Sequence, residues 1–205
     1  MLCLHVNHAR VGSSRLNQIM REIGFQAINE PFHPNSAGKN LKDYKDDIKK
    51  HSQLNDNDLN SKNYNSTLTI KETLKAFSKS PKPYFSGVVN HHFHGRKILL
   101  AQLCSMYPLL ILQRNLLDSY ISQLKAEMTL KWTKVDTTSI KPTLSAIHFK
   151  AYCEKIINYY NLCFYSAKSY HNNIYILNYE DWSALSNPLQ VNSISKYFRE
   201  KDIAF

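Results

Sequence analysis

Cysteine is sparse in this chain and follows none of the spacings that bind zinc or form redox pairs. The four cysteines, Cys3, Cys104, Cys153 and Cys163, are nowhere two or three residues apart, which excludes a zinc knuckle and a CxxC motif. Three of them lie within apolar runs, where we expect small core side chains and a reducing compartment. No run of 18 apolar residues is present, so we expect no membrane span. The first ten residues predict a strand and a loop, which argues against a signal peptide and favours a cytoplasmic protein.

Arginine is scarce in a chain that is strongly basic. Lysine and arginine together number 26 against 16 acidic residues, which gives a formal net charge of +10, yet only six of the 26 are arginine. This balance favours anionic partners such as nucleotides, sulfated or phosphorylated substrates, nucleic acid or acidic lipid. A lysine-rich solvated surface would give the same balance. Because arginine is rare, the position of each one is informative.

Glycine is also scarce, with five in 205 residues and none after Gly95. The Walker pattern G-x-x-x-x-G-K-[ST] is absent, and no Gly-Lys pair lies near the first loop of the chain. Because that pattern holds the phosphates of ATP in many nucleotide-binding proteins, its absence argues against an ATPase or a kinase.

Short apolar segments that predict strands alternate with segments of helical periodicity. The predicted strands are residues 2–6, 25–28, 84–90, 109–113 and 174–178. The predicted helices are residues 16–23, 67–77, 95–106, 116–130, 149–170 and 192–198. This alternation is typical of an α/β fold with a parallel sheet covered on both faces, a three-layer sandwich.

The segment of residues 35–66 is rich in Asn, Asp, Lys and Ser and is the least core-like part of the sequence. It predicts a helix over residues 41–50 followed by a mobile loop through Asn65. The hydrophobic content of 43% is enough for a sizeable core. We therefore expect one domain over residues 1–205 with a polar insertion at about 35–66.

The loop after the first predicted strand has the composition of an anion site. A parallel sheet binds ligands at the carboxyl ends of its strands. Gly12 allows close approach of the backbone, and Ser13 and Ser14 offer donors at a helix N-terminus. Arg10 and Arg15 add positive charge. An ordinary strand-turn-helix junction with serine caps would use similar residues.

A second cluster follows the apolar strand of residues 109–113. Arg114 stands where that strand ends, and Ser122 follows eight residues later, about 12 Å along a helix axis. The two side chains can converge on one phosphate if the helix leans over the strand end. The alternative is an arginine at a strand end and an unrelated surface serine.

Together the two clusters resemble those of sulfotransferases. In that family a first loop of the type Pro-Lys/Arg-Ser-Gly-Ser/Thr-Thr cradles the 5′-phosphosulfate of the donor. A second motif, Arg-Asn-Pro-x-Asp with a serine eight residues after the arginine, holds the 3′-phosphate. The Tyr-Glu-Asp run at residues 179–181 is similar to the family's Tyr-Glu-Asp-Leu, and the Glu-Pro-Phe run at residues 30–32 to one in bacterial members that act on saccharides.

The resemblance, which is greatest to bacterial Nod-factor and trehalose sulfotransferases, implies a P-loop-NTPase-like sulfotransferase fold. It also implies transfer of a sulfuryl group from 3′-phosphoadenosine 5′-phosphosulfate to a hydroxyl acceptor, on a carbohydrate or glycolipid, with no required metal. The residues expected to bind the nucleotide are Arg10, Gly12, Ser13, Ser14, Arg15, Arg114 and Ser122. Arg15 is included for its positive charge.

The chain departs from the family's pattern at several positions. Val11 replaces the serine that usually precedes the glycine, and Leu116 stands where proline is common. The absence of glycine after Gly95 means that the C-terminal glycine-rich loop of animal cytosolic sulfotransferases is missing.

Three residues are expected to carry the chemistry. Arg10 would stabilise the charge that develops on the transferring group. Glu30, which follows a strand end, is the first candidate for the base that takes the proton of the acceptor hydroxyl. His33 is the alternative base, because imidazole titrates near neutral pH.

His91, His92 and His94 form a His-His-x-His run after a predicted strand. It fits acceptor-pocket histidines, plain surface residues or a metal site, although no carboxylate or cysteine nearby in sequence would complete the metal site. The tyrosine-rich segment 152–170 fits a sugar groove or ordinary core packing.

Two other functions share some of these features. One is a P-loop kinase-like nucleotide phosphotransferase, which should carry a Gly-Lys pair and a magnesium carboxylate. The other is a non-enzymatic basic module that binds polyanions, which should interleave basic and aromatic residues on one face. The lysines cluster instead at residues 39–82, so we expect no nucleic-acid partner. A homodimer is compatible with the sequence.

Overall fold

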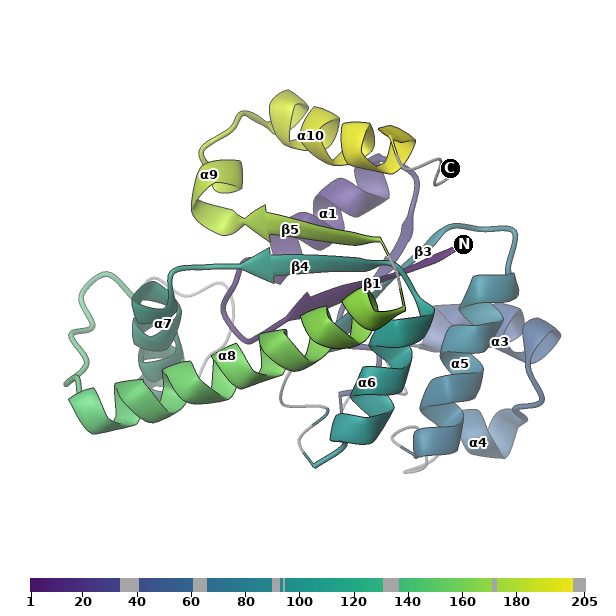
Figure 1. The fold of residues 1–205 in the computed structure, drawn as a ribbon, viewed down its shortest axis with the longest axis horizontal. Helices are drawn as coiled ribbons and strands as arrows, with labels where there is room; N and C mark the ends of the chain where they lie inside the picture. The colour runs from purple at the N-terminus through teal and green to yellow at the C-terminus, as the bar shows by residue number, and fades with distance from the viewer. Residues whose placement is uncertain are drawn as a thin grey trace.

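The chain forms a five-stranded sheet in which every pair of neighbouring strands is parallel (Figure 1). The computed structural model describes residues 1–33, 41–60, 66–89, 93, 95–130, 137–170 and 173–200. The strands follow the order β2-β3-β1-β4-β5, and their bounds are Leu2–Asn7 (β1), Gln26–Ile28 (β2), Tyr84–Val89 (β3), Leu109–Gln113 (β4) and Ile174–Asn178 (β5). The structure confirms the predicted α/β class and the all-parallel sheet.

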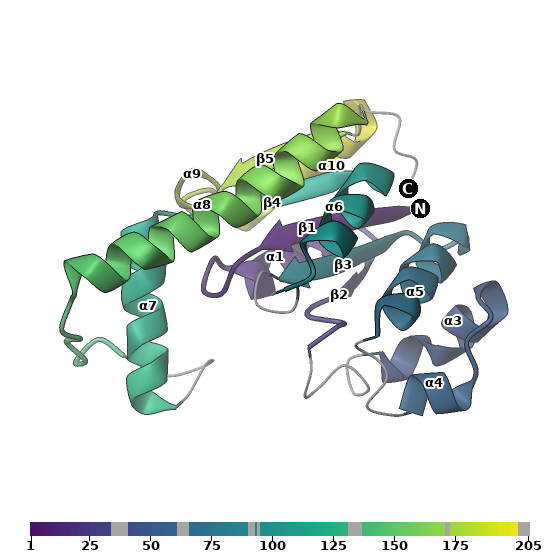
Figure 2. The ribbon, with the colours of Figure 1, turned by 60° about the horizontal axis from the view of Figure 1, so that its bottom comes forward.

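Helices cover both faces of this sheet (Figures 1 and 2). Alternate side chains of β1 point to opposite faces, so that Leu4 belongs to one hydrophobic cluster and Cys3 to the other. The first cluster includes residues of α5 (Thr67–Lys79), α6 (Lys97–Met106) and α8 (Ala146–Ser169). The second includes residues of α1 (Ser13–Glu22), α9 (Tyr179–Ser183) and α10 (Asn187–Glu200). The arrangement is that of a three-layer α/β sandwich.

The strand order creates a reversal point beside β1. After β1 the chain builds β2 and β3 on one side of it, whereas β4 and β5 lie on the other side. Ligands of open parallel sheets bind outside the carboxyl ends of the strands at such a point. In Figure 1 the arrowheads of β1, β4 and β5 point to the edge where α7 (Leu116–Thr129) and the first turns of α8 lie.

The segment predicted as a polar insertion contributes to the core. Its described part forms the short 3-10 helix η1 (Lys42–Tyr44), α3 (Lys45–His51) and α4 (Asp56–Asn60), which lie beside α5 (Figure 2). Leu41, Ile48 and Leu59 are fully buried. The sequence predicted a loop from residue 51 to residue 65, but residues 56–60 form α4. Leu54 and Leu59, which are isolated in a polar sequence, belong to the same hydrophobic cluster as residues of α5.

The C-terminal part is more helical than the sequence predicted. Helix α9 was not expected; the Asn178 side chain caps it by accepting hydrogen bonds from the backbone amides of Glu180 and Asp181. Helix α10 begins five residues earlier than predicted, at Asn187. The proline at position 188 lies in its first turn, where a missing backbone N–H costs nothing. Within the described ranges, no helix is both long and apolar enough to cross a membrane.

Candidate functional site

The loop between β1 and α1 has a backbone conformation that only some residues tolerate. Gly12 has a φ of 88° and stands at the N-cap of α1. A Cβ atom at this position would lie 2.1 Å from Cε2 of Tyr179. Glycine is therefore required here both for the left-handed backbone and for the close approach of the Tyr179 ring. Arg10 also has a positive φ of 69°, so the turn is strained at a residue that the sequence had assigned to the site.

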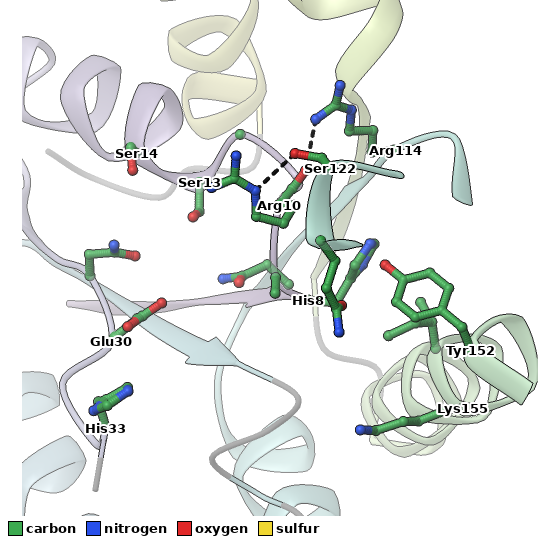
Figure 3. Close-up of a pocket in the computed structure, with 16 residues that line it drawn as sticks. His8, Arg10, Ser13, Ser14, Glu30, His33, Arg114, Ser122, Tyr152 and Lys155 are labelled. Carbon is green, nitrogen blue, oxygen red and sulfur yellow. Dashed lines mark hydrogen bonds between the residues drawn. The ribbon is translucent and has the colours of Figure 1, made fainter. Parts of the chain in front are cut away.

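The two arginine clusters predicted from the sequence meet at this loop (Figure 3). Arg10 Nε donates a hydrogen bond to Ser122 Oγ at 2.9 Å. Arg114 Nη1 donates one to the backbone oxygen of Arg10 at 2.8 Å. Residues more than 100 positions apart in the chain thus share one network. Burial and the neighbouring Arg114 charge both lower the pKa of the Arg10 guanidinium, because each disfavours its charged form.

The Tyr-Glu-Asp run after β5 supports Arg114. The guanidinium lies 4.9 Å from the centre of the Tyr179 ring, a distance typical of a cation–π contact. Glu180 Oε1 lies 3.9 Å from Arg114 Nε and accepts a hydrogen bond from the backbone amide of Asn115 at 3.0 Å. The end of β5 therefore fixes the direction in which Arg114 projects from the end of β4.

Arg10, Arg114 and Ser122 line a cavity of about 820 Å³ at the carboxyl edge of the sheet. This volume is within the range of small-molecule sites. The cavity extends from the β1 loop to α8, and Figure 3 shows Glu30 and His33 on one side of it and Tyr152 and Lys155 on the other. Its lining includes Asn7, His8, Arg10, Gly12, Ser13, Ser14, Glu30, His33, Arg114, Ser122, Gln123, Tyr152 and Lys155.

Of the nucleotide-binding residues predicted from the sequence, Arg15 is the one that does not line this cavity. Its guanidinium donates hydrogen bonds to Gln190 Oε1 at 3.1 and 3.0 Å and to the side-chain oxygen of Asn187. Both partners belong to α10. Because successive residues of a helix N-terminus point in different directions, Arg15 points away from the cavity and ties α1 to α10, which covers the same face of the sheet.

Glu30 and His33 belong to the loop after β2 and line the cavity together. The backbone of Glu30 has a φ of 49°, and a Cβ atom on Gly87 would lie 3.1 Å from its amide nitrogen. The glycine in β3 thus lets this loop approach the sheet closely. Burial raises the pKa of the Glu30 carboxyl, and the nearby His33 opposes that change. A carboxyl with a raised pKa in a cavity is a candidate for proton transfer.

Sequence reasoning missed His8, the residue that follows β1. It is 2% exposed and lines the cavity. Its Nδ1 lies 2.8 Å from the hydroxyl of Tyr160, and that hydroxyl donates a hydrogen bond to the backbone oxygen of Leu112 at 2.6 Å. The sequence feature that could have indicated His8 was a polar side chain directly after an apolar strand. Its partner lies 152 residues away in the chain, so the sequence could not reveal the contact.

Helix α8 supplies the wall that faces the β1 loop. Tyr152 and Lys155 line the cavity, whereas Tyr159 and Tyr160 are buried in the core. The tyrosine-rich helix thus contributes both to the core and to the wall of the cavity. His91, His92 and His94 lie outside the described residues. Within the described part, no group of three or more His, Cys, Asp or Glu side chains could hold a metal ion.

Comparisons with known proteins give no relative of this chain: it matches no model of a protein family, no curated protein and no solved structure. A functional proposal for this chain therefore rests on the chemistry and geometry of the residues that line the cavity.

Proposed function

We propose that this protein is a sulfotransferase that transfers a sulfuryl group from 3′-phosphoadenosine 5′-phosphosulfate to a hydroxyl group of a carbohydrate or glycolipid. The observation that carries the proposal is the hydrogen-bonded network of Arg10, Ser122 and Arg114 on one cavity. The sequence resemblance assigned these residues to the two ends of one nucleotide. Their contact supports a single site with two cationic parts.

The donor groups fit a nucleotide with anions at both its 5′ and its 3′ positions. Gly12, Ser13 and Ser14 stand at the start of the ten-residue helix α1, where backbone amides and the helix dipole favour the 5′-phosphosulfate. Arg114 and Ser122 offer a guanidinium and a hydroxyl for the 3′-phosphate. Arg10 lies between the two groups, bonded to the second through Ser122. A bound anion would also relieve the repulsion between the two guanidinium groups.

The proposed reaction is an in-line displacement at sulfur. The acceptor oxygen forms a bond to sulfur while the bond between sulfur and the bridging oxygen breaks. The electron pair of the broken bond stays on the 5′-phosphate of adenosine 3′,5′-bisphosphate, and the acceptor proton goes to a base. As in phosphoryl transfer, the protein's contribution is positioning and electrostatic stabilisation. Arg10 supplies positive charge where the bridging oxygen becomes negative.

Glu30 is the proposed base, and its raised pKa supports the assignment. A carboxylate that holds a proton more tightly than usual is a stronger acceptor for the proton of a hydroxyl. His33 lines the same part of the cavity and stays the alternative. The Glu30→Gln variant distinguishes them: it should fold and bind nucleotide but lose turnover if Glu30 is the base, and keep turnover if His33 is.

Thermal stability measured with added nucleotides tests the proposal. Adenosine 3′,5′-bisphosphate at 100 times its dissociation constant should stabilise the protein by about 2.7 kcal/mol, and ATP should stabilise it less. Arg114→Ala should abolish this stabilisation. Arg199 is an exposed arginine of α10 that does not line the cavity, so Arg199→Ala should leave the stabilisation intact.

Other outcomes of this measurement favour other functions. A preference for ATP that depends on Mg²⁺ would favour the kinase-like phosphotransferase. Stabilisation by any polyanion, sensitive to salt and unaffected by Arg114→Ala, would favour a basic polyanion-binding module.

A further inference from the structure

The cavity contains a buried hydrogen-bond acceptor that no role described above uses. His8 follows β1 and is 2% exposed, and its Nε2 atom is buried. In the part of the chain that the structure describes, this nitrogen has no hydrogen-bond partner. Buried polar atoms are nearly always satisfied, so an orphan on the wall of a cavity indicates a group that arrives with a ligand.

The contacts on the other side of the ring determine where its proton lies. The Tyr160 hydroxyl has one proton, and it donates that proton to the Leu112 backbone oxygen at 2.6 Å, because a carbonyl can only accept. The hydroxyl oxygen must therefore accept at its 2.8 Å contact with His8 Nδ1. The proton of His8 is then on Nδ1, and Nε2 presents a lone pair.

The surroundings keep the ring neutral. Burial, followed by the positive charge of Arg114, lowers the pKa of His8 to about 3. At neutral pH the ring consequently offers no donor at Nε2. The cationic groups of the cavity, Arg10, Arg114 and Lys155, can only donate hydrogen bonds. His8 Nε2 therefore provides an acceptor in a cavity that also contains these three donor groups.

We propose that His8 is a specificity-determining residue whose Nε2 accepts a hydrogen bond from a hydroxyl group of the bound ligand, and that Tyr160 positions it by fixing its tautomer. An anionic group at this point would meet the lone pair and be rejected, whereas a neutral hydroxyl would satisfy it. The inference rests on the proposed function, which supplies two sources of such a hydroxyl: the ribose of the nucleotide and the sugar acceptor.

Nitrogen-15 NMR of the histidine rings tests the tautomer directly. Wild-type His8, assigned by the signal lost in His8→Phe, should be neutral with its proton on Nδ1 from pH 5 to pH 8. Tyr160→Phe should mix the two tautomers while leaving the fold intact. A wild-type ring protonated on Nε2, or charged at pH 6, would overturn the inference even if Tyr160→Phe did not fold.

Binding measurements then identify the source of the hydroxyl. A neutral hydrogen bond of about 1 kcal/mol corresponds to roughly a fivefold change in affinity. If the ribose supplies the hydroxyl, His8→Phe should lower the affinity for adenosine 3′,5′-bisphosphate by about this factor. It should leave the affinity for the 2′-deoxy analogue unchanged. If the acceptor supplies it, both nucleotides should bind as before, and trehalose added to the nucleotide complex should shift the Nε2 resonance of wild-type protein.

His5→Phe is the matched control, since His5 is equally buried in β1, stacks on Phe85 with ring centroids 5.1 Å apart and does not line the cavity. It should change neither nucleotide affinity nor the His8 resonance. The inference would be overturned, and the proposed function would stand, if two results held together. Wild type and His8→Phe would bind the nucleotide equally, and neither adenosine 3′,5′-bisphosphate nor trehalose would shift the Nε2 resonance. Failure of wild-type protein to bind adenosine 3′,5′-bisphosphate at all would overturn the proposed function, and with it the ligand that the inference assumes.

Discussion

At the scale of single residues, the site depends on a few positions that tolerate little change. Gly12 faces a tyrosine ring and has a backbone that other residues rarely adopt. Arg10 has a positive φ and shares a network with a second arginine. Glu30 combines a positive φ with burial. Strain and repulsion of this kind persist only where the surrounding structure enforces them, and they cluster at functional sites.

Gly12→Ala should destabilise the protein and abolish nucleotide binding. The new methyl group would overlap the Tyr179 ring and the backbone would be strained, which together should lower the free energy of unfolding by about 3 kcal/mol. Gly24→Ala is the control: its φ is 98°, but no atom beyond its chain neighbours lies within 4 Å of the added Cβ, so only the backbone cost of about 1 kcal/mol applies. Urea unfolding measures both. Equal losses in the two variants would contradict the role of Tyr179.

Arg10→Ala should reduce turnover of 3′-phosphoadenosine 5′-phosphosulfate about 100-fold, because a donor aimed at developing charge contributes about 3 kcal/mol to the transition state. The expected change is in kcat more than in nucleotide affinity, since Arg114 and Ser122 still hold the 3′-phosphate. Turnover within a factor of two of wild type would remove Arg10 from the mechanism.

Glu30→Gln should lose turnover about 100-fold or more and gain stability at neutral pH. The folded-state pKa of Glu30 lies above the ordinary value of 4.5, so the folded protein binds this proton more tightly than the unfolded chain and loses stability as the carboxyl ionises. The gain in the variant should be absent below pH 4.5 and grow as the pH rises through the raised pKa. Melting temperatures measured against pH test this, and a gain that is independent of pH would contradict it.

At the scale of helices and strands, β1, β4 and β5 bring the site together from three parts of the sequence. Their carboxyl ends carry Arg10, Arg114 and Glu180, and α8 closes the cavity from the other side. Parallel pairing in register, with Val6 of β1 opposite Ile111 of β4, places the loops that follow these strands side by side. The elements thus determine which loops meet.

Arg15→Ala should weaken the packing of α1 on α10 without affecting the cavity. Its hydrogen bonds to Gln190 and Asn187 are partly exposed, so we expect a loss of about 1 kcal/mol in the free energy of unfolding. Affinity for adenosine 3′,5′-bisphosphate, measured by calorimetry, should equal that of wild type. A loss of affinity comparable to that of Arg114→Ala would show that Arg15 reaches the nucleotide after all.

The strands could be predicted from the sequence because each is a short apolar run between turn residues, and the bounds of β4 and β5 agree with the prediction. Helix α4 could not be predicted, because its segment is polar with a few leucines, and these are buried only in the cluster that they form with residues of α5. Helix α9 was missed because it is a single turn capped by Asn178. Local patterns thus predicted the regular elements but missed α4, whose leucines lie in a cluster with residues of α5, and α9, which is too short to show a periodicity.

At the scale of the whole molecule, the excess of positive charge and the placement of arginine have different consequences. The net charge of +10 attracts anions in general, whereas the site uses two of the six arginines at the reversal point of the sheet. The sequence predicted that Arg10 and Arg114 share a sheet edge, because both follow strands of one parallel sheet. It could not predict the contacts of Ser122 with Arg10 or of His8 with Tyr160, which depend on how α7 and α8 lean over that edge.

A crystal structure of the protein with adenosine 3′,5′-bisphosphate tests this account most directly. We expect the 5′-phosphate on the loop from Arg10 to Ser14 and the 3′-phosphate within hydrogen-bond distance of both Arg114 and Ser122. A nucleotide bound outside the cavity, or bound there with Arg114 directed away from either phosphate, would contradict it.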